Sequence, residues 1–298
     1  MSGVRKFEHA TLRVTDLPAA VEFYTEVLGL TELEERDGVV YLGCGLDENY
    51  DLGLVEGGTG VDHVAVRAPD EETLDEYESR LGEAGVDVER TGGAEPNQTG
   101  GVRFELPTGI GMELVTVADA SYHHPTRTVG DRKRTAPVDV DHANLASYHP
   151  DRDLDFLTEH LDFVVSDRIE GETGFTVQAW VRRGDFHHDL GISTADNVAH
   201  TLHHLSFEMA GIDAIKAFCD DLTAAGHQLE LGPSRHNAGS NVFAYLWSPG
   251  GNRIELTAEM ATVDESAEPG VRTITREENT VSSWGGVVPT REFLEKGS

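Results

Sequence analysis

Leu202-His203-His204-Leu205-Ser206-Phe207 is the stretch that decides the fold, because its pattern occurs four times in the chain. Three earlier runs, Phe7-Glu8-His9, Val61-Asp62-His63 and Val140-Asp141-His142, also place a histidine third in a short strand-like segment. A helix-like segment follows each run, so the chain is built from one repeated unit. Repetition places the four histidines at equivalent positions of equivalent strands. A metal site assembled across paired repeats is therefore the first hypothesis to test.

Start and stop signals divide each repeat into one helix and several strands. Aspartate or glycine precedes each amphipathic segment, and glycine ends three of the four. The start signals are Asp16, Asp70, Asp153 and Gly211, and the stop signals are Gly29, Gly85 and Gly226. Short β-like runs follow the helices at residues 39–43, 102–106, 175–181 and 242–247. The unit is therefore βαβββ, and the predicted fold class is α+β.

Four such modules in 298 residues predict two domains of two modules each. The pattern breaks around residues 118–137. The expected boundaries are 1–120 for the first domain, 121–137 for the linker, 138–262 for the second domain and 263–298 for the tail. In the tail, Trp284 and the run Val287-Val288-Pro289 could pack as a short cap, and a partly disordered tail is equally compatible with the sequence.

The composition is strongly acidic. Lys and Arg number 23 against 54 Asp and Glu, which gives a net charge of −31 and argues against a nucleic-acid or anionic-membrane partner. The acidic residues run through helices and loops alike, as is typical of proteins adapted to high internal salt; an unusually acidic mesophilic protein is the alternative. Two cysteines, no long apolar run and no signal-peptide pattern predict a cytoplasmic protein.

Strand alternation gives the histidines a common face. His204 and Ser206 alternate with Leu205 and Phe207, so the helix that covers the apolar face leaves His204 on the other side. That side is either solvent or the hollow of a curved sheet. Ten of the fourteen histidines lie between His142 and His236, and this clustering favours the hollow and concentrates reactive capacity in the second domain.

A carboxylate completes the set. Glu255 lies in Asn252-Arg253-Ile254-Glu255-Leu256, on a final strand, with its side chain opposite Ile254 and Leu256. Two histidines and one carboxylate from three strands form the facial set that suits Fe(II), with open positions for a substrate and O₂.

Several short motifs resemble the type I extradiol ring-cleavage dioxygenases, in particular catechol 2,3-dioxygenase. These motifs are Val140-Asp141-His142-Ala143, His188-Asp189-Leu190, Leu202-His203-His204-Leu205-Ser206-Phe207, Gly232-Pro233-Ser234-Arg235-His236 and the stretch from Tyr245 to Glu255. That family belongs to the vicinal oxygen chelate superfamily, whose unit is the βαβββ module. The resemblance therefore implies four modules paired into two domains of curved mixed sheet.

The resemblance also implies roles for individual residues. His142, His204 and Glu255 would bind Fe(II), with Mn(II) possible in its place. His188 would be the acid/base residue, and His236 and Tyr245 would hold the catecholate oxygens and the developing charge. A catechol must lose at least one proton when it chelates a metal, so a nearby neutral histidine suits this chemistry. The family further implies a homo-oligomer, in particular a tetramer.

Two pairs of neighbouring histidines leave alternatives open. Because alternation sends neighbours to opposite faces, only one of His187 and His188, and one of His203 and His204, is expected to face the metal. The apolar companions of His203 favour a structural role for it, and the His-Asp-Leu match favours His188. Tyr245 taken alone could be a core aromatic, although its position ten residues before Glu255 fits a pocket wall.

The expected function is extradiol cleavage of a catechol or substituted catechol with O₂ and Fe(II), in the degradation of aromatic compounds. One alternative is another metal-dependent enzyme of the same fold, such as an isomerase or a thiol transferase. The other is a non-catalytic ligand-binding or resistance module. A base beside the metal favours an enzyme, since a pure binder has no need for one.

The first domain repeats the ligand trio as His9, His63 and Glu113. Fifty residues separate His63 from Glu113, and fifty-one separate His204 from Glu255. The supporting residues differ: the expected counterparts of His188, His236 and Tyr245 are Tyr50, Ala94 and Phe104. The first domain is therefore expected to be catalytically silent, with a metal bound weakly or not at all.

Overall fold

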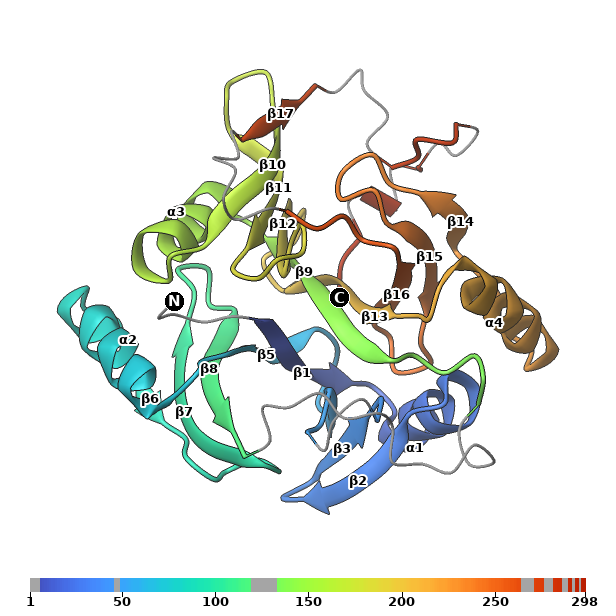
Figure 1. Ribbon diagram of the computed structural model, residues 1–298, viewed down its shortest axis with the longest axis horizontal. Coiled ribbons are helices and arrows are strands. Elements are labelled where there is room, and N and C mark those ends of the chain that lie inside the picture. The colour runs from blue at the N-terminus through green and yellow to red at the C-terminus, as the bar shows by residue number, and fades with distance from the viewer. Residues whose placement is uncertain are drawn as a thin grey trace.

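The computed structural model describes residues 6–45, 49–118, 133–263, 271–275, 281–285, 289–290, 293–294 and 296–298. Four βαβββ modules follow one another in these residues, as the repeat predicted (Figure 1). The first consists of β1 (Lys6–Val14), α1 (Leu17–Glu22) with its continuation η1 (Phe23–Leu28), β2 (Thr31–Arg36), β3 (Val39–Gly43) and β4 (Leu52–Glu56). The second consists of β5 (Val61–Arg67), α2 (Glu71–Glu83), β6 (Glu89–Arg90), β7 (Gln98–Glu105) and β8 (Gly111–Val117).

The remaining modules repeat this order. The third consists of β9 (Asp139–Ser147), α3 (Pro150–His160), β10 (Val164–Glu170), β11 (Thr176–Arg182) and β12 (Leu190–Thr194). The fourth consists of β13 (Leu202–Glu208), α4 (Ile212–Ala224), β14 (Leu231–Arg235), β15 (Val242–Trp247) and β16 (Arg253–Ala258). A further short strand, β17 (Arg272–Ile274), comes from the tail.

Each pair of modules forms one mixed sheet. The first sheet has the strand order β2-β3-β4-β1-β5-β8-β7-β6, and the second has β14-β15-β16-β13-β9-β12-β11-β10-β17. Antiparallel pairing of β1 with β5, and of β9 with β13, joins the two modules at the centre of each sheet. The predicted α+β class of paired βαβββ modules is confirmed.

Three of the four predicted helix starts agree with the structure. Asp16 and Asp70 cap α1 and α2 by accepting the backbone N–H groups of Ala19 and Thr73 at 3.0 and 2.9 Å. Gly211 directly precedes α4. Asp153 is not a cap, because α3 already begins at Pro150, whose fixed φ suits a first turn.

Asp153 instead connects the third module, in the second sheet, to the second module, in the first sheet. Its buried carboxylate accepts hydrogen bonds from the hydroxyl and the backbone N–H of Thr108, at 2.6 and 3.2 Å. Burial raises the pKa of Asp153, although the hydrogen bonds from Thr108 and Ser147 oppose this effect. A residue with the chemistry of a helix cap therefore joins two modules, through a contact between residues 45 positions apart in sequence.

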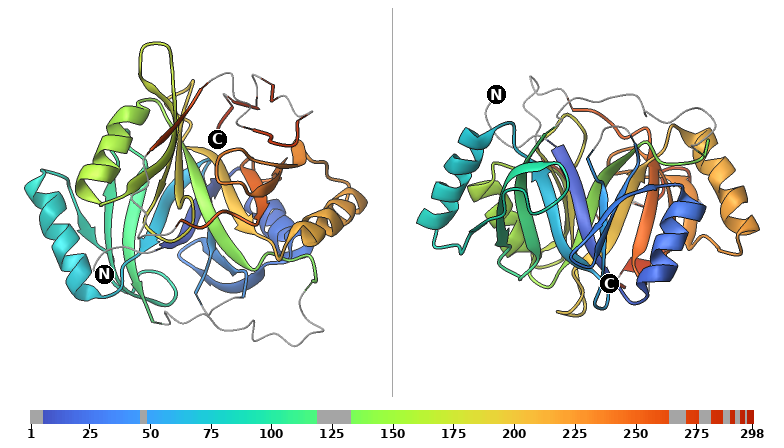
Figure 2. Two further views of the ribbon diagram at one scale, coloured as in Figure 1. Left: turned by 45° about the horizontal axis from the view of Figure 1, so that its top comes forward. Right: turned by 90° about the horizontal axis from the view of Figure 1, so that it is seen from below.

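The two sheets share one apolar core, with the helices on the outside of the molecule (Figure 2). Phe23 of η1 contacts His227 beyond α4, with ring centroids 5.1 Å apart, so helical segments of different sheets pack together. Polar contacts cross the boundary as well: Lys6 Nζ lies 2.5 Å from Asp139 Oδ2, and the Gly60 N–H donates to Asn252 Oδ1 at 2.8 Å. The sheets are thereby held in a fixed relation.

The tail packs against the second sheet where it is described. β17 pairs with the edge strand β10, and Ile274 packs with Ile169 and Trp180. Val281 and Phe293 pack with Phe243 and Tyr245. The predicted packing of Val287-Val288, and most of the predicted linker 121–137, lie outside the described residues. None of the helices in the described chain is long and apolar enough to span a membrane.

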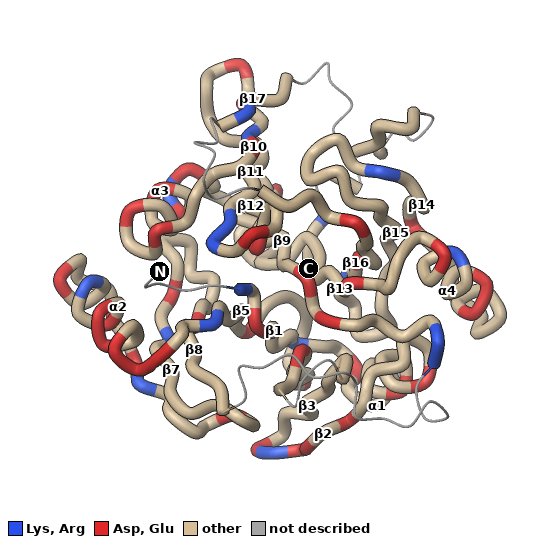
Figure 3. Tube along the Cα trace, in the orientation of Figure 1, with Lys and Arg blue, Asp and Glu red and all other residues tan. Residues whose placement is uncertain are grey.

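Carboxylates are spread over the helices, strand ends and loops of both sheets, as Figure 3 shows. The net charge of −31 is therefore distributed around the molecule, and the folded chain repels itself more than the unfolded one does.

We expect the thermal midpoint to rise by several degrees between dilute buffer and molar KCl, because about 1 M salt shortens the Debye length to roughly 3 Å. Differential scanning calorimetry over a KCl series measures it. A midpoint that stays level or falls would contradict the assignment of the acidic residues to salt adaptation.

Candidate metal centre

Neighbouring strands of the second sheet bring the predicted site residues together. The order β15-β16-β13-β9-β12 makes five strands adjacent. Tyr245 pairs with Glu255 across β15 and β16, and Ser206 of β13 pairs with Glu255 on one side and with His142 of β9 on the other. His204 lies two residues before Ser206, and therefore on the same face of β13. Backbone register alone gathers these side chains at one place.

The ligand atoms of His142, His204 and Glu255 converge. The two Nε2 atoms are 3.2 Å apart, and they lie 3.1 and 3.0 Å from Glu255 Oε2. All three side chains are at most 5% exposed. Ligand atoms held about 2.1 Å from a common centre at right angles would lie about 3.0 Å from one another. The trio therefore fits a divalent metal ion.

The charges of the trio depend on its neighbours. Burial lowers the pKa of His142, but hydrogen bonds with Asp141 and Glu255 outweigh burial and raise it to about 9. Burial lowers the pKa of His204 to about 4, although Glu255 opposes this. Burial raises the pKa of Glu255, yet the three histidines around it hold it well below its usual value. A carboxylate that stays ionised when buried needs a cation beside it.

Hydrogen bonds at the far side of each ring orient the imidazoles. His142 Nδ1 lies 2.5 Å from Asp141 Oδ2. His204 Nδ1 lies 2.6 Å from His203 Nδ1, and His203 Nε2 lies 3.1 Å from the carbonyl oxygen of Phe293. A carbonyl can only accept, so His203 Nε2 carries the proton and His203 Nδ1 accepts from His204. The Nε2 lone pair of His204 is then free to face the metal position, as a metal ligand requires.

The strict alternation expected for His203 and His204 does not hold. A register shift between Leu202 and His204 interrupts the pairing of β13 with β9. Leu202 and Leu205 both lie in the apolar core, and both histidines border the cavity on the other side. His203 is structural, as expected, but it packs against Phe293 of the tail, with ring centroids 5.4 Å apart. The sequence carries no signal for this bulge.

A cavity of about 690 Å³ opens beside the trio. Its walls are mainly apolar, and they are formed by Ile169, Phe175, Val177, Trp180, Phe293 and Leu294. Polar side chains line it as well, among them the trio, His188, His236 and Tyr245. A cavity with broad apolar walls and a cluster of metal-ligand atoms on its surface suits an aromatic ligand with adjacent oxygen atoms.

The structure places His188, and not His187, on the cavity wall. The His188 ring lies 4.3 Å from the ring of His142, centroid to centroid. His187 Nε2 lies 3.3 Å from Asp167 Oδ2, away from the trio. Burial, with the neighbouring histidines, lowers the pKa of His188 well below its usual value. His188 is therefore neutral at neutral pH, as a general base must be.

His236 and Tyr245 lie against each other on the cavity wall. His236 Nδ1 donates to the carbonyl of Val281 at 2.9 Å, so its Nε2 accepts the Tyr245 hydroxyl at 2.9 Å. Stacking on Phe243, with centroids 3.8 Å apart and planes 12° apart, holds the His236 ring. Burial, with the charge of Glu255, raises the pKa of Tyr245 well above its usual value and keeps it protonated. The Tyr245 hydroxyl can hydrogen-bond a substrate oxygen when it turns away from His236 Nε2.

Sequence reasoning missed several cavity residues. Asn241 donates to Glu255 Oε1 at 3.3 Å and to Thr257 Oγ1 at 2.7 Å, and so fixes the carboxylate. Trp180 and Phe293 form apolar walls. Asn241 follows a Gly-Ser turn, and Phe293 belongs to a tail without periodicity, so no pattern singled them out. The sequence around Trp180 does not distinguish it from other aromatic residues in strands.

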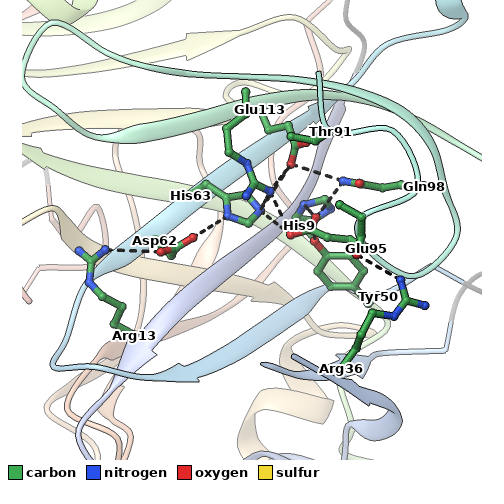
Figure 4. A network of polar contacts seen from close by, with 12 residues as sticks. His9, Arg13, Arg36, Tyr50, Asp62, His63, Thr91, Glu95, Gln98 and Glu113 are labelled. Atoms are coloured by element: carbon green, nitrogen blue, oxygen red, sulfur yellow. Dashed lines mark hydrogen bonds and ion pairs between the residues drawn. The ribbon is translucent and has the colours of Figure 1, made fainter. Parts of the chain in front are cut away.

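The first domain holds a related cluster, in which His9 and His63 face Glu95 and Glu113 (Figure 4). The expectation that Phe104 matches Tyr245 is wrong. Arg103 pairs with Glu113 across β7 and β8, as Tyr245 pairs with Glu255, and each lies ten residues before its glutamate.

The expectation for Ala94 is also incomplete, because the neighbouring Glu95 sends its carboxylate into the cluster. Tyr50 stands where expected, and its hydroxyl donates to Glu95.

Paired βαβββ modules with a metal-ligand cluster in the hollow of the sheet define the vicinal oxygen chelate class of proteins. The family model of the Glyoxalase/Bleomycin resistance protein/Dioxygenase superfamily matches residues 6–114 and 139–256. The chain therefore belongs to this superfamily.

The chain is 26% identical over 270 residues to a manganese-dependent 2,3-dihydroxybiphenyl 1,2-dioxygenase of Geobacillus genomosp. 3, covering 85% of this chain and 84% of that protein. Homoprotocatechuate 2,3-dioxygenase from Arthrobacter globiformis superposes with a TM-score of 0.88 at 26% identity, covering 100% of this chain and 92% of that one. The Mn(II)-bound glyoxalase from Novosphingobium aromaticivorans superposes with a TM-score of 0.86 at 25% identity, covering 100% and 96%. The predicted kinship with extradiol dioxygenases is confirmed.

Replacing His204 with Ala should remove tight metal binding, because two remaining ligands hold a divalent ion far less well than three. Metal analysis after desalting measures this, and His200→Ala, in the loop before β13, is the matched control. If His204→Ala retains a full equivalent of metal while Glu255→Ala loses it, His204 is not a ligand.

Replacing His203 with Phe should weaken metal affinity by roughly 10–100-fold, the usual effect of removing a partner that orients a ligand. The ring volume stays, but the acceptor for His204 Nδ1 is lost. Competition with a chelator measures the affinity, and His203→Gln, which can restore one hydrogen bond, should recover part of it. Unchanged affinity in both variants would exclude an orienting role.

Proposed function

We propose that this protein is an extradiol dioxygenase that opens the ring of a catechol or substituted catechol beside its two hydroxyl groups, using O₂. One observation carries the proposal: the trio of His142, His204 and Glu255 lines a cavity with broad apolar walls, and His188 and Tyr245 line the same cavity. Membership of the superfamily and similarity to two ring-cleaving dioxygenases support it.

His142, His204 and Glu255 would hold Fe(II), or Mn(II) in its place. The ion would supply a Lewis acid with open positions, which lowers the pKa of a bound hydroxyl group. The protein's own groups complete the site around the substrate. His188, neutral at neutral pH, would take a proton from a catechol hydroxyl and return it later as an acid.

His236 and Tyr245 would orient the catechol and stabilise charge on its oxygens. A hydrogen bond joins the two side chains on the cavity wall, and the hydrogen bond to the carbonyl of Val281 fixes the His236 tautomer. Because both rings are already held in place, only the hydroxyl hydrogen has to turn toward the substrate, which keeps the reorganisation small. The apolar walls, including Trp180 and Phe293, would exclude water and hold the aromatic ring.

A metal-dependent isomerase is the second candidate, because the Mn(II)-bound glyoxalase superposes almost as well as the dioxygenase does. A thiol transferase or a non-catalytic binding module of the same fold would share the trio too. A neutral histidine beside the ligands is the feature that favours the dioxygenase over a binder. Substrate turnover separates the candidates, since only a dioxygenase consumes O₂ with a catechol.

The wider assignments follow from the sequence. We place the catalytic unit in residues 138–262 and a silent unit in 1–120, joined by the linker 121–137 and followed by the tail 263–298. The acidic composition supports a salt-rich cytoplasm, and the resemblance supports a homo-oligomer, in particular a tetramer. Size-exclusion chromatography with light scattering at several salt concentrations tests the oligomer.

The direct experiment loads the protein anaerobically with Fe(II) or Mn(II), adds catechol and then admits air. Formation of a yellow ring-opened product, with one O₂ consumed per catechol, is expected for one or both metals. The measurement should be made at low and molar KCl, because the acidic composition predicts a fold that is more stable in salt. Absence of O₂ uptake with a panel of substituted catechols, in metal-loaded protein, would exclude the proposal.

Replacing His188 with Phe should lower turnover by roughly 10²–10⁴ while metal and catechol binding persist, because a positioned acid/base contributes this much. Single-turnover absorbance and metal analysis separate the two effects. His187→Phe is the companion variant, since His187 lies off the cavity wall; because it removes the His187 Nδ1 contact with His188 Nδ1 at 3.0 Å, it should lower turnover much less than His188→Phe does. Loss of turnover in His187→Phe with a silent His188→Phe would reverse the assignment.

A further inference from the structure

The first sheet repeats the backbone frame of the metal centre. Ala65 of β5 pairs with Glu113 on one side and with His9 on the other, as Ser206 pairs with Glu255 and His142. His63 lies two residues before Ala65, as His204 lies two before Ser206. The ligand trio of the second sheet is thus reproduced strand for strand.

One ligand keeps its orientation although its hydrogen-bond partner differs. His63 Nδ1 lies 3.0 Å from Asp62 Oδ2, whereas Nδ1 of its counterpart His204 lies beside His203. The Nδ1 proton therefore points outward, and the Nε2 lone pair of His63 points into the cluster. His9 is 1% exposed, and its Nε2 points into the cluster, 3.5 Å from Glu95 Oε2. These are features of residues arranged around a cation.

A side chain supplies that cation. Arg103 Nη2 donates to Glu113 Oε2 at 2.8 Å and to Glu95 Oε1 at 3.0 Å, and it lies 3.1 Å from His63 Nε2. One nitrogen atom thus contacts both carboxylates and the histidine lone pair. Burial lowers the pKa of Arg103, but Glu113 and Glu95 outweigh burial and raise it, so the guanidinium stays charged.

The spacing of the ligand atoms agrees with a guanidinium nitrogen at the centre of the cluster. His63 Nε2 lies 3.6 Å from Glu113 Oε2 and 3.4 Å from Glu95 Oε1, whereas the ligand atoms of the second sheet lie 3.0 to 3.2 Å apart. Hydrogen bonds to a guanidinium nitrogen are longer than bonds to a metal, so a cluster built around one is wider.

We propose that Arg103 is the resident cation of the first domain, held where the second domain holds its metal ion, and that it blocks a divalent-metal site formed by His9, His63, Glu95 and Glu113. The fourth ligand, Glu95, makes this site richer in carboxylate than the trio of the second sheet. Carboxylate-rich sites favour hard ions such as Mn(II). Removing the guanidinium therefore opens a Mn(II) site.

The test uses the full chain in a His204→Ala background, so that only the first domain can hold a tight metal. After incubation with Mn(II) alone and desalting, His204→Ala should retain no metal and His204→Ala with Arg103→Met about one equivalent. Adding Glu113→Gln should abolish that equivalent. Arg36→Met is the matched control, because Arg36 bonds Glu34 and the Ala94 carbonyl outside the cluster and should leave the count at zero.

Thermal unfolding provides the second readout. Arg103→Met without metal should melt roughly 5 °C or more below the parent, because two buried carboxylates lose their counter-ion, and Mn(II) should restore much of this loss. If Arg103→Met does not fold, Arg103→Tyr, which carries the residue of the same register in the second domain, takes its place.

Two outcomes overturn the proposal. One is an equivalent of metal in His204→Ala that is lost on His63→Ala, since Arg103 would then not block the site. The other is a folded Arg103 variant that binds no Mn(II). Neither result depends on ring-cleaving activity, so the proposed function stands or falls separately.

Discussion

A buried carboxylate at the centre of each sheet is the constraint on which the rest of the structure depends. Glu255 is 1% exposed and Glu113 is 0% exposed, and burying a carboxylate without a cation beside it is costly. The second sheet surrounds its glutamate with histidines whose lone pairs converge, which suits a metal ion. The first sheet places a guanidinium against its glutamate. The same arrangement of strands therefore allows a buried glutamate to be balanced either by a metal ion or by a guanidinium.

Strand register decides which solution each sheet adopts. The residue that pairs with the central glutamate across the hairpin is Tyr245 in the second sheet and Arg103 in the first. Tyrosine at this position points a hydroxyl at the cavity and leaves the metal position open. Arginine reaches the centre and fills it. A single position in an otherwise repeated ladder thus separates a site with room for substrate from one closed by its own side chain.

The fold and the residues of the metal centre could be predicted because they follow from a repeat and from period-two alternation, which survive in one sequence. Three details of the structure could not be predicted in this way. The bulge before His204 breaks the alternation without leaving a sequence signal. Asp153 looks like a helix cap but binds Thr108 in another module, a contact that only the packing of the sheets creates. Phe104, the expected counterpart of Tyr245, lies one residue beyond Arg103, which is the residue in register, and in a strand a shift of one residue exchanges one face for the other.

The tail links the candidate site to the end of the chain. Phe293 presents its carbonyl to His203 and its ring to the cavity and to Tyr245, with ring centroids 5.0 Å apart. The buried guanidinium of Arg253 bonds the Lys296 carbonyl at 2.8 Å, and Ser298 exchanges backbone hydrogen bonds with Leu202. Because His203 also accepts the hydrogen bond from His204 Nδ1, the position of the tail and the orientation of a metal ligand are joined by two consecutive hydrogen bonds. A displacement of the tail would therefore remove a cavity wall and release a ligand together, which makes the last residues part of the site although no motif marks them.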